Sequence, residues 1–117
     1  MTKPVEEKRK YLRLNVPVEI GYLLPGSDRI YTAVTKDISA SGIRFETVEN
    51  FQNGLGLELT LKLPNIQNPV HVYGKIAWQE KSNRKDGVFT DVGIEFVKVE
   101  EDNKNTFLKY LCDLIYG

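Results

Sequence analysis

The chain has 117 residues, 41% of them hydrophobic, and its 16 basic residues equal its 16 acidic residues, so the formal net charge is zero. This length fits one small domain, and the neutral total argues against a protein that coats DNA through bulk positive charge. No apolar stretch reaches the roughly 18 residues of a membrane-spanning helix. The N-terminus lacks a signal-peptide core, and the lone Cys112 excludes an internal disulfide. We therefore expect a cytoplasmic protein.

The charges are unevenly distributed along the chain. Residues 1–14 hold five basic and two acidic side chains, a net charge of +3, whereas residues 91–117 hold six acidic and three basic ones, a net charge of −3. The basic segment would either bind an anion or be a solvated end, and charge alone does not decide between these. We expect residues 1–14 to form a mobile arm, because they are charged and short of apolar side chains.

Hydrophobic and polar residues alternate with a period of two through the middle of the chain, which predicts half-buried β-strands. The turn residues Pro25–Asp28 and Pro64–Pro69 separate some of these strands, and Glu80–Gly87 is predicted to be a charged loop. In the fifth strand Trp78 continues the inward register of Val70 to Ile76, so we expect it in the core. The predicted strands cover about 16–23, 30–35, 42–47, 55–63, 70–79 and 88–97.

The period changes near the C-terminus. Asp102 is a suitable N-cap, and five apolar residues then recur at helical spacing: Phe107, Leu108, Leu111, Cys112 and Ile115. These patterns predict an all-β fold, a six-stranded antiparallel β-barrel over residues 15–99 followed by a C-terminal α-helix over 102–116, in one domain spanning 1–117. A barrel also removes the exposed sheet edges of so small a chain.

Catalysis has little support in the sequence. The only histidine, His71, lies on the polar face of a strand, and no second histidine or cysteine accompanies it in a metal-binding pattern. The acidic run from Glu100 to Asp102 suits a helix start better than an acid–base pair, and both common phosphate-binding glycine loops are absent. We predict no enzyme, no metal and no cofactor.

Two arginines, Arg9 and Arg13, precede the first strand in an R-x-x-x-R pattern. Guanidinium groups pair bidentately with phosphate and with the O6/N7 edge of guanine. Two of them on one short arm would suit a phosphorylated purine, although so short a pattern also arises by chance.

A second motif, Asp37-Ile38-Ser39-Ala40-Ser41-Gly42, lies between two predicted strands. Its composition is ordinary for a turn in which Asp37 or Ser39 caps backbone amides. The same residues would also suit the reading of a base, because a carboxylate accepts hydrogen bonds from N1–H and N2–H₂ of guanine. Gly42 would let the backbone approach a ligand closely or adopt a positive φ.

Together, R-x-x-x-R followed about two strands later by D-x-S-x-x-G resembles the PilZ domain, a bacterial receptor for cyclic di-GMP. Weaker similarities lie in the strand phrase at 72–78, which ends in tryptophan, and in the phrase at 92–96, which ends in an aromatic residue. The resemblance runs from about Lys8 to Phe96, with the helix after it, and all five motif positions match. It implies the PilZ-like split barrel.

The resemblance implies a receptor that binds cyclic di-GMP without breaking it. Arg9 and Arg13 would hold the phosphates and a guanine edge, Asp37 and Ser39 would contact a guanine, and Gly42 would keep the turn tight. Binding would order the arm and signal to an unidentified partner protein in motility, biofilm or virulence control. Further candidate contacts are Lys8, Lys10 and Ser41.

Two alternatives remain open at this level. One is a nucleotide-independent PilZ-type adaptor that binds other proteins. The other is a small barrel for single-stranded nucleic acid, which needs aromatic and basic residues on one face; its candidates would be Tyr31, His71, Tyr73 and Lys75. We favour the cyclic di-GMP receptor, acting as a monomer or weak homodimer, with no DNA partner.

Overall fold

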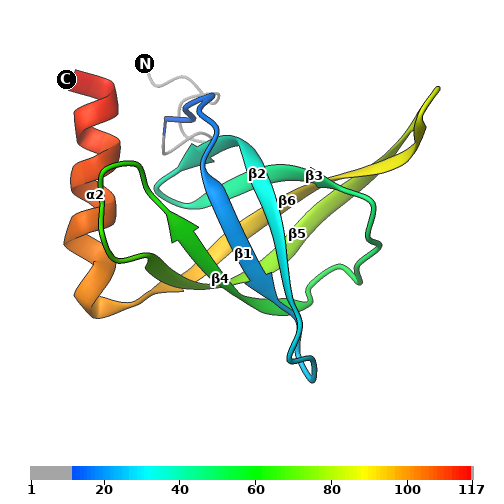
Figure 1. The fold of residues 1–117 in the computed structure, drawn as a ribbon, viewed down its shortest axis with the longest axis horizontal. Helices are drawn as coiled ribbons and strands as arrows, with labels where there is room; N and C mark the ends of the chain where they lie inside the picture. The colour runs from blue at the N-terminus through cyan, green and yellow to red at the C-terminus, as the bar shows by residue number, and fades with distance from the viewer. Residues whose placement is uncertain (1–11, 117) are drawn as a thin grey trace, which may run out of the picture.

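The computed structural model describes residues 12–116, apart from the side chains of 101–103. Within this range six strands precede one helix (Figure 1), which confirms the predicted fold class. The helix begins at Glu101, so Asp102 lies in its first turn and is not the N-cap. The elements are β1 (Glu19–Leu23), β2 (Ile30–Ser39), β3 (Gly42–Thr47), β4 (Gly56–Lys62), β5 (Val70–Arg84), β6 (Gly87–Val99) and α2 (Glu101–Tyr116).

The strands form a closed antiparallel barrel in the order β1-β2-β3-β6-β5-β4, and β1 pairs with β4 to close it. The predicted alternation of β4 holds, because every second residue from Leu57 to Leu63 is buried. Tyr22 lies among these aliphatic side chains, and its ring stacks on Tyr31 with 5.3 Å between centroids. Burial raises the pKa of the Tyr22 hydroxyl. The barrel interior is thus an apolar core and not a ligand cavity.

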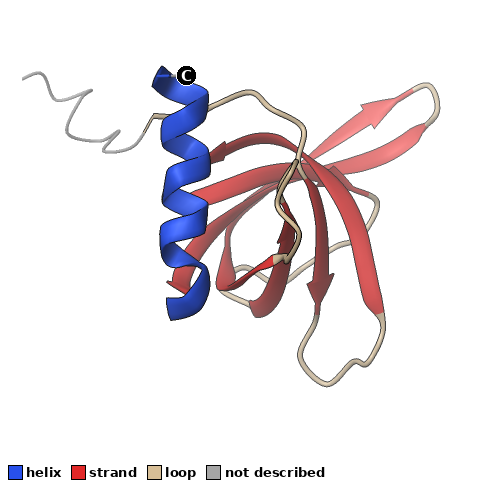
Figure 2. Ribbon diagram, turned by 60° about the vertical axis from the view of Figure 1, so that its left-hand side comes forward, coloured by secondary structure: helices blue, strands red, loops and turns tan. Residues whose placement is uncertain are grey.

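The helix α2 packs beside the barrel against β5 (Figure 2). Phe107 and Leu111 are buried, and the Phe107 ring meets Phe96 edge-on with 5.7 Å between centroids. The predicted stripe is too wide, because a single helix beside a closed barrel buries only its nearest edge; Leu108, Cys112 and Ile115 are exposed. Among the described residues, no helix is long and apolar enough to cross a membrane.

The predicted loop at Glu80–Gly87 is instead the end of a long hairpin. β5 and β6 remain paired from the barrel out to Arg84 and Gly87, and this ribbon projects beyond the barrel (Figures 1 and 2). Most of its residues from 80 to 88 are exposed, because both faces meet solvent. A two-sided polar ribbon lacks the alternation that marks a half-buried strand, which is why the sequence pattern missed it.

Candidate functional site

The D-x-S-x-x-G motif spans the end of β2, the tight two-residue turn at Ala40 and Ser41, and the first residue of β3. Asp37 and Ser39 end β2, and Gly42 begins β3 opposite Ser39. The Ser39 hydroxyl accepts a hydrogen bond from the Ser41 amide at 3.1 Å and donates to the Gly42 carbonyl at 3.4 Å. Ser39 is 1% exposed. Its hydroxyl therefore holds the turn together, as the purely structural interpretation of the motif expects.

Gly42 is required by the packing of two strands. A Cβ atom built on it would lie 2.2 Å from the carbonyl oxygen of Ile94 on β6. The same turn is tied to β6 by a hydrogen bond from the Phe96 amide to the Ser41 carbonyl at 2.8 Å. Gly42 is not among the glycines of positive φ. The absence of a side chain thus lets β3 approach β6 closely, which is a reason that the sequence did not reveal.

A β-bulge turns Asp37 to the outside of the barrel. Thr35 pairs with Phe45 and points inward, where its hydroxyl bonds to the backbone of Val16 and Val18. By strict alternation Asp37 would also point inward, but the register shifts between these residues, so Asp37 lies opposite Arg44. A bulge inserts one residue and re-aims the side chains that follow it. Lys36 is the extra residue of this bulge, and the bulge therefore directs the Asp37 carboxylate to the outer face of the barrel.

Two guanidinium groups hold the Asp37 carboxylate. Arg13 Nη1 lies 2.7 Å from Oδ1, and Arg44 Nε lies 2.9 Å from Oδ2. Arg13 is brought there because the neighbouring Leu14 pairs with Ile38 through two backbone hydrogen bonds of 2.8 and 2.9 Å. The structure thus brings the predicted residues Arg13 and Asp37 together. Arg13 and Leu14, the last two residues of the predicted arm, lie against β2.

A second bulge exposes Trp78, which corrects its predicted place in the core. Ile76 pairs with Ile94 and Trp78 pairs with Gly93, so Ala77 is the extra residue. The indole lies across Gly93, where a Cβ atom would be 2.2 Å from its Nε1, and Trp78 is 40% exposed. Register pairing places four residues side by side across β2, β3, β6 and β5, and we call them the outer row: Asp37, Arg44, Gly93 and Trp78.

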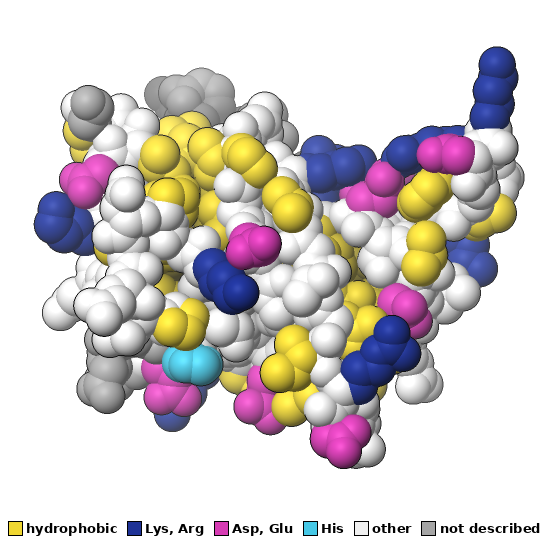
Figure 3. All heavy atoms as spheres, in the orientation of Figure 1, with side chains coloured by type: hydrophobic (Ala, Val, Ile, Leu, Met, Phe, Trp, Pro, Cys, Tyr) yellow, Lys and Arg dark blue, Asp and Glu magenta, His cyan; other side chains and the backbone are white. Residues whose placement is uncertain are grey.

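Alternating charges continue from the outer row toward the β5–β6 hairpin. Arg44 Nη1 lies 3.4 Å from Asp91 Oδ2, and Lys36 Nζ lies 3.6 Å from Asp91 Oδ1 and 3.5 Å from Glu46. Arg84 pairs with Glu46 and stacks over Phe89. In the space-filling view basic and acidic side chains lie next to one another along this side of the molecule (Figure 3). Among the described residues, the charges of the site are therefore largely paired.

Four further candidates came from the sequence. Lys8, Arg9 and Lys10 lie outside the described residues. Ser41 lies in the β2–β3 turn, partly buried beside the Ser39 hydroxyl at 3.2 Å between their Oγ atoms. Arg44 and Trp78 are the site residues that sequence reasoning missed. Arg44 follows the motif by only two positions, which was the available signal, whereas the exposure of Trp78 depends on a bulge without a sequence signature.

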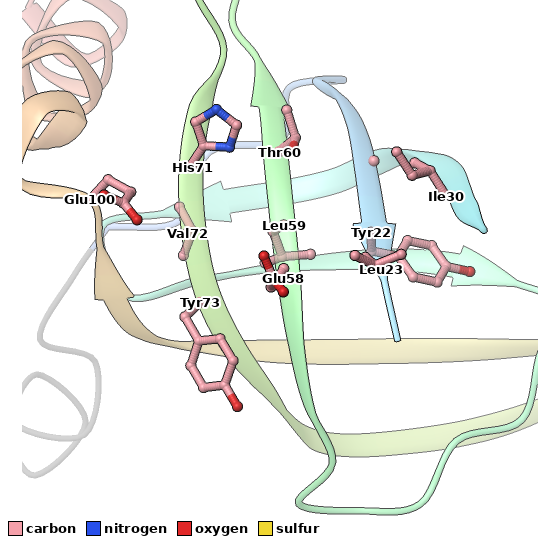
Figure 4. A pocket seen from close by; sticks show the side chains of 11 residues that line it. Tyr22, Leu23, Ile30, Glu58, Leu59, Thr60, His71, Val72, Tyr73 and Glu100 are labelled. Atoms are coloured by element: carbon pink, nitrogen blue, oxygen red, sulfur yellow. The ribbon is translucent and has the colours of Figure 1, made fainter. Parts of the chain in front are cut away.

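A separate hollow of about 350 Å³ lies on the outer face of β1, β4 and β5 (Figure 4). Glu58, Thr60, His71 and Tyr73 project there from two adjacent strands, and Glu100 lies nearby. None of the motif residues lines it, and the described residues that do line it include carboxylates but no Lys or Arg. Because carboxylates repel phosphate, this hollow does not suit a cyclic dinucleotide.

The surface considered for single-stranded nucleic acid is not assembled in the structure. Tyr31 is half-buried and stacks on Tyr22 on the inner side of the barrel, whereas His71, Tyr73 and Lys75 are exposed on β5. Lys75 also pairs with Glu95 at 3.6 Å. The four candidates thus do not share one face, which removes the aromatic and basic platform that such binding needs.

The barrel, the C-terminal helix and the Asp37 hairpin define a known class of domain. The model of the PilZ domain matches residues 7–112, so this chain belongs to the PilZ domain family. A search of curated protein sequences finds no match.

Several solved structures share this fold, a PilZ domain among them. The PilZ domain with c-di-GMP of YcgR from Escherichia coli has a TM-score of 0.66 and 13% identity over 89% of this chain and 88% of that one. The K. pneumonia MrkH–c-di-GMP complex has a TM-score of 0.75 and 16% identity, over 92% of this chain and 52% of that one. The Bacillus subtilis inhibitor of motility MotI/DgrA has a TM-score of 0.68 and 18% identity, over 87% of this chain and 48% of that one. This chain therefore spans about half the length of the last two.

Proposed function

We propose that this protein is a cyclic di-GMP receptor that binds the nucleotide at the outer row and passes the signal to a partner protein. The observation that carries the proposal is the Arg13–Asp37 contact of 2.7 Å, which joins the arginine motif to the base-reading motif. Membership of the PilZ family supports it, as do the c-di-GMP complexes of YcgR and MrkH. The proposed reaction is binding without bond cleavage, so no catalytic residue is assigned.

The roles follow from the chemistry of each group. The guanidinium of Arg13, 44% exposed, would pair with a phosphate or with the O6/N7 edge of guanine, and Arg9 would supply a second guanidinium. Asp37 would accept from N1–H and N2–H₂ of guanine. Ser39, Ser41 and Gly42 would shape the turn that carries Asp37. A ligand held by both motifs would fix the N-terminal segment to the barrel, and this rearranged surface is the proposed signal to the partner.

Calorimetry with the purified protein tests the proposal directly. We expect saturable binding of cyclic di-GMP at micromolar concentration or below, and an accompanying rise in melting temperature, because a ligand that binds only the folded state stabilises it. Neither heat nor a thermal shift at high micromolar nucleotide would refute the proposal. That result would favour the nucleotide-independent adaptor, for which the ion pairs around Asp37 would serve only the fold.

Trp78 should take part in binding as an aromatic surface at the end of the outer row. It is the only tryptophan, so its emission should change on addition of cyclic di-GMP. Stacking of a base on an aromatic ring is worth about 1–3 kcal/mol, so Trp78→Ala should lower the affinity by about five- to a hundredfold. Tyr73→Ala is the matched control, because Tyr73 is also an exposed aromatic of β5 but lies at the separate hollow. Equal losses for both variants, or unchanged emission at saturation, would contradict this role.

A further inference from the structure

Both oxygens of the Asp37 carboxylate already lie close to a guanidinium group in this structure. Arg13 Nη1 donates a hydrogen bond to Oδ1 at 2.7 Å, whereas Arg44 Nε lies 2.9 Å from Oδ2 as an ion pair without hydrogen-bond geometry, and the Asp37 side chain is only 8% exposed. A guanine that reads this carboxylate must reach the same two oxygens. A guanine that uses Oδ1 therefore competes with the hydrogen bond from Arg13.

The two arginines differ in how firmly they are placed. Arg13 precedes β1, and within residues 12–14 the backbone is attached to β2 through the isolated bridge between Leu14 and Ile38. Arg44 lies inside β3, paired with Asp37 on one side and with Gly93 on the other. The guanidinium of Arg44 has a second hold on Asp91, with Nη1 3.4 Å from Oδ2. Arg44 is thus placed by a strand paired on both sides and by a second ion pair, whereas Arg13 has fewer such constraints.

We infer, on the basis of the proposed function, that Arg44 is a positioning residue for guanine recognition. It holds Oδ2 of Asp37 from one side, so that when Arg13 turns to a phosphate the carboxylate keeps its orientation and its negative charge. The oxygen Oδ1 and the remaining lone pair of Oδ2 are then presented to N1–H and N2–H₂. A carboxylate without this hold would have to be ordered by the ligand itself, which weakens binding.

The role is measurable as a loss of discrimination between bases. Cyclic di-inosine monophosphate has the same phosphates and the same N1–H but lacks the N2 amine. We expect the wild type to prefer cyclic di-GMP, because an unmet buried acceptor is costly. Arg44→Ala should lower the affinity for cyclic di-GMP by about tenfold and the affinity for the inosine analogue less, so the preference shrinks. Arg44→Lys keeps the positive charge but lacks the planar guanidinium group, so it should recover part of the preference for cyclic di-GMP.

A double-mutant cycle separates positioning from direct contact. If Arg44 acts through Asp37, then Arg44→Ala added to Asp37→Ala should change the affinity by no more than about twofold. A further large loss in that background would mean that Arg44 contacts the ligand itself, and an unaltered preference in Arg44→Ala would mean that it does not position Asp37. Either result overturns the inference while the wild type still binds. Absence of wild-type binding would overturn the proposed function as well.

Arg29→Ala is the control for the loss of one positive charge. Arg29 immediately precedes β2, at the end of the strand opposite to Asp37, and its guanidinium stacks over Tyr31 at 4.7 Å from the ring centroid. Its removal should leave both affinities within about twofold of the wild type. A loss of preference in Arg29→Ala equal to that in Arg44→Ala would attribute the effect to net charge and overturn the inference.

Discussion

Replacing Gly42 with alanine should destabilise the protein by about 3 kcal/mol or more. The added Cβ would lie 2.2 Å from the backbone oxygen of Ile94, and a carbonyl in the middle of a paired strand cannot move aside as a side chain can. β3 and β6 would have to separate, which would weaken the ladder that joins Gly42 to Glu95 and Ile43 to Ile94. In thermal denaturation we expect a fall in melting temperature of about 10 °C or more.

Gly21→Ala is the matched control for Gly42→Ala. Gly21 is also a strand glycine without a positive φ, but its nearest neighbour would be the Cγ2 methyl of Ile30 at 3.3 Å. Ile30 is 68% exposed, so its side chain can yield. The stability of this variant should change by less than about 1 kcal/mol in either direction. If Gly42→Ala melted at the same temperature as Gly21→Ala, the close approach of β3 and β6 would not explain why glycine stands at position 42.

The prediction for Gly42 shows how a binding motif can also be a structural motif. Ser39 closes the β2–β3 turn with its hydroxyl, and Gly42 lets that turn lie on β6. Both residues act on the backbone that carries Asp37, and Ser39 is buried. Substitutions at Ser39 or Gly42 would therefore lower ligand affinity through the shape of the turn, whether or not these residues touch a ligand.

The fold was predictable because most strands have one face in the core. The leucines of β4 and the inward residues of β1 are buried as their alternation predicts, since burial on one face imposes a period of two. The outer half of the β5–β6 hairpin was not predictable, because neither of its faces is buried. The helix was predicted at almost its observed length, but its buried edge depends on how it lies against β5.

The candidate site was only half predictable, and the two bulges are the reason. The motifs alone named Arg13 and Asp37 as candidates, but their direct contact is seen only in the structure. Arg44 and Trp78 enter the site through register. The extra residues Lys36 and Ala77 place Asp37 opposite Arg44 and Trp78 opposite Gly93. Side-chain alternation assumes an unbroken register, and so it assigns the residues after each bulge to the wrong face.

Arg13→Ala should lower the affinity for cyclic di-GMP by about ten- to a hundredfold, which corresponds to the loss of a charge-assisted pair worth roughly 1.5–3 kcal/mol. The partner of Arg13 in this structure, Asp37, would not be left unpaired, because Arg44 holds its other oxygen at 2.9 Å. The variant should therefore fold as the wild type does. Calorimetry gives the affinity, and thermal denaturation without nucleotide confirms the fold.

Two comparisons show whether the loss belongs to the guanidinium of Arg13. Arg13→Lys keeps the positive charge but cannot form two parallel hydrogen bonds, so its affinity should fall between those of the wild type and Arg13→Ala. Arg29→Ala removes the same charge at the opposite end of β2 and should bind as the wild type does. Because part of the contribution of Arg13 is electrostatic and exposed, added salt should narrow the gap between the wild type and Arg13→Ala. Wild-type affinity in Arg13→Ala would place the nucleotide away from the Arg13–Asp37 contact, and so away from the end of the outer row where the two motifs meet.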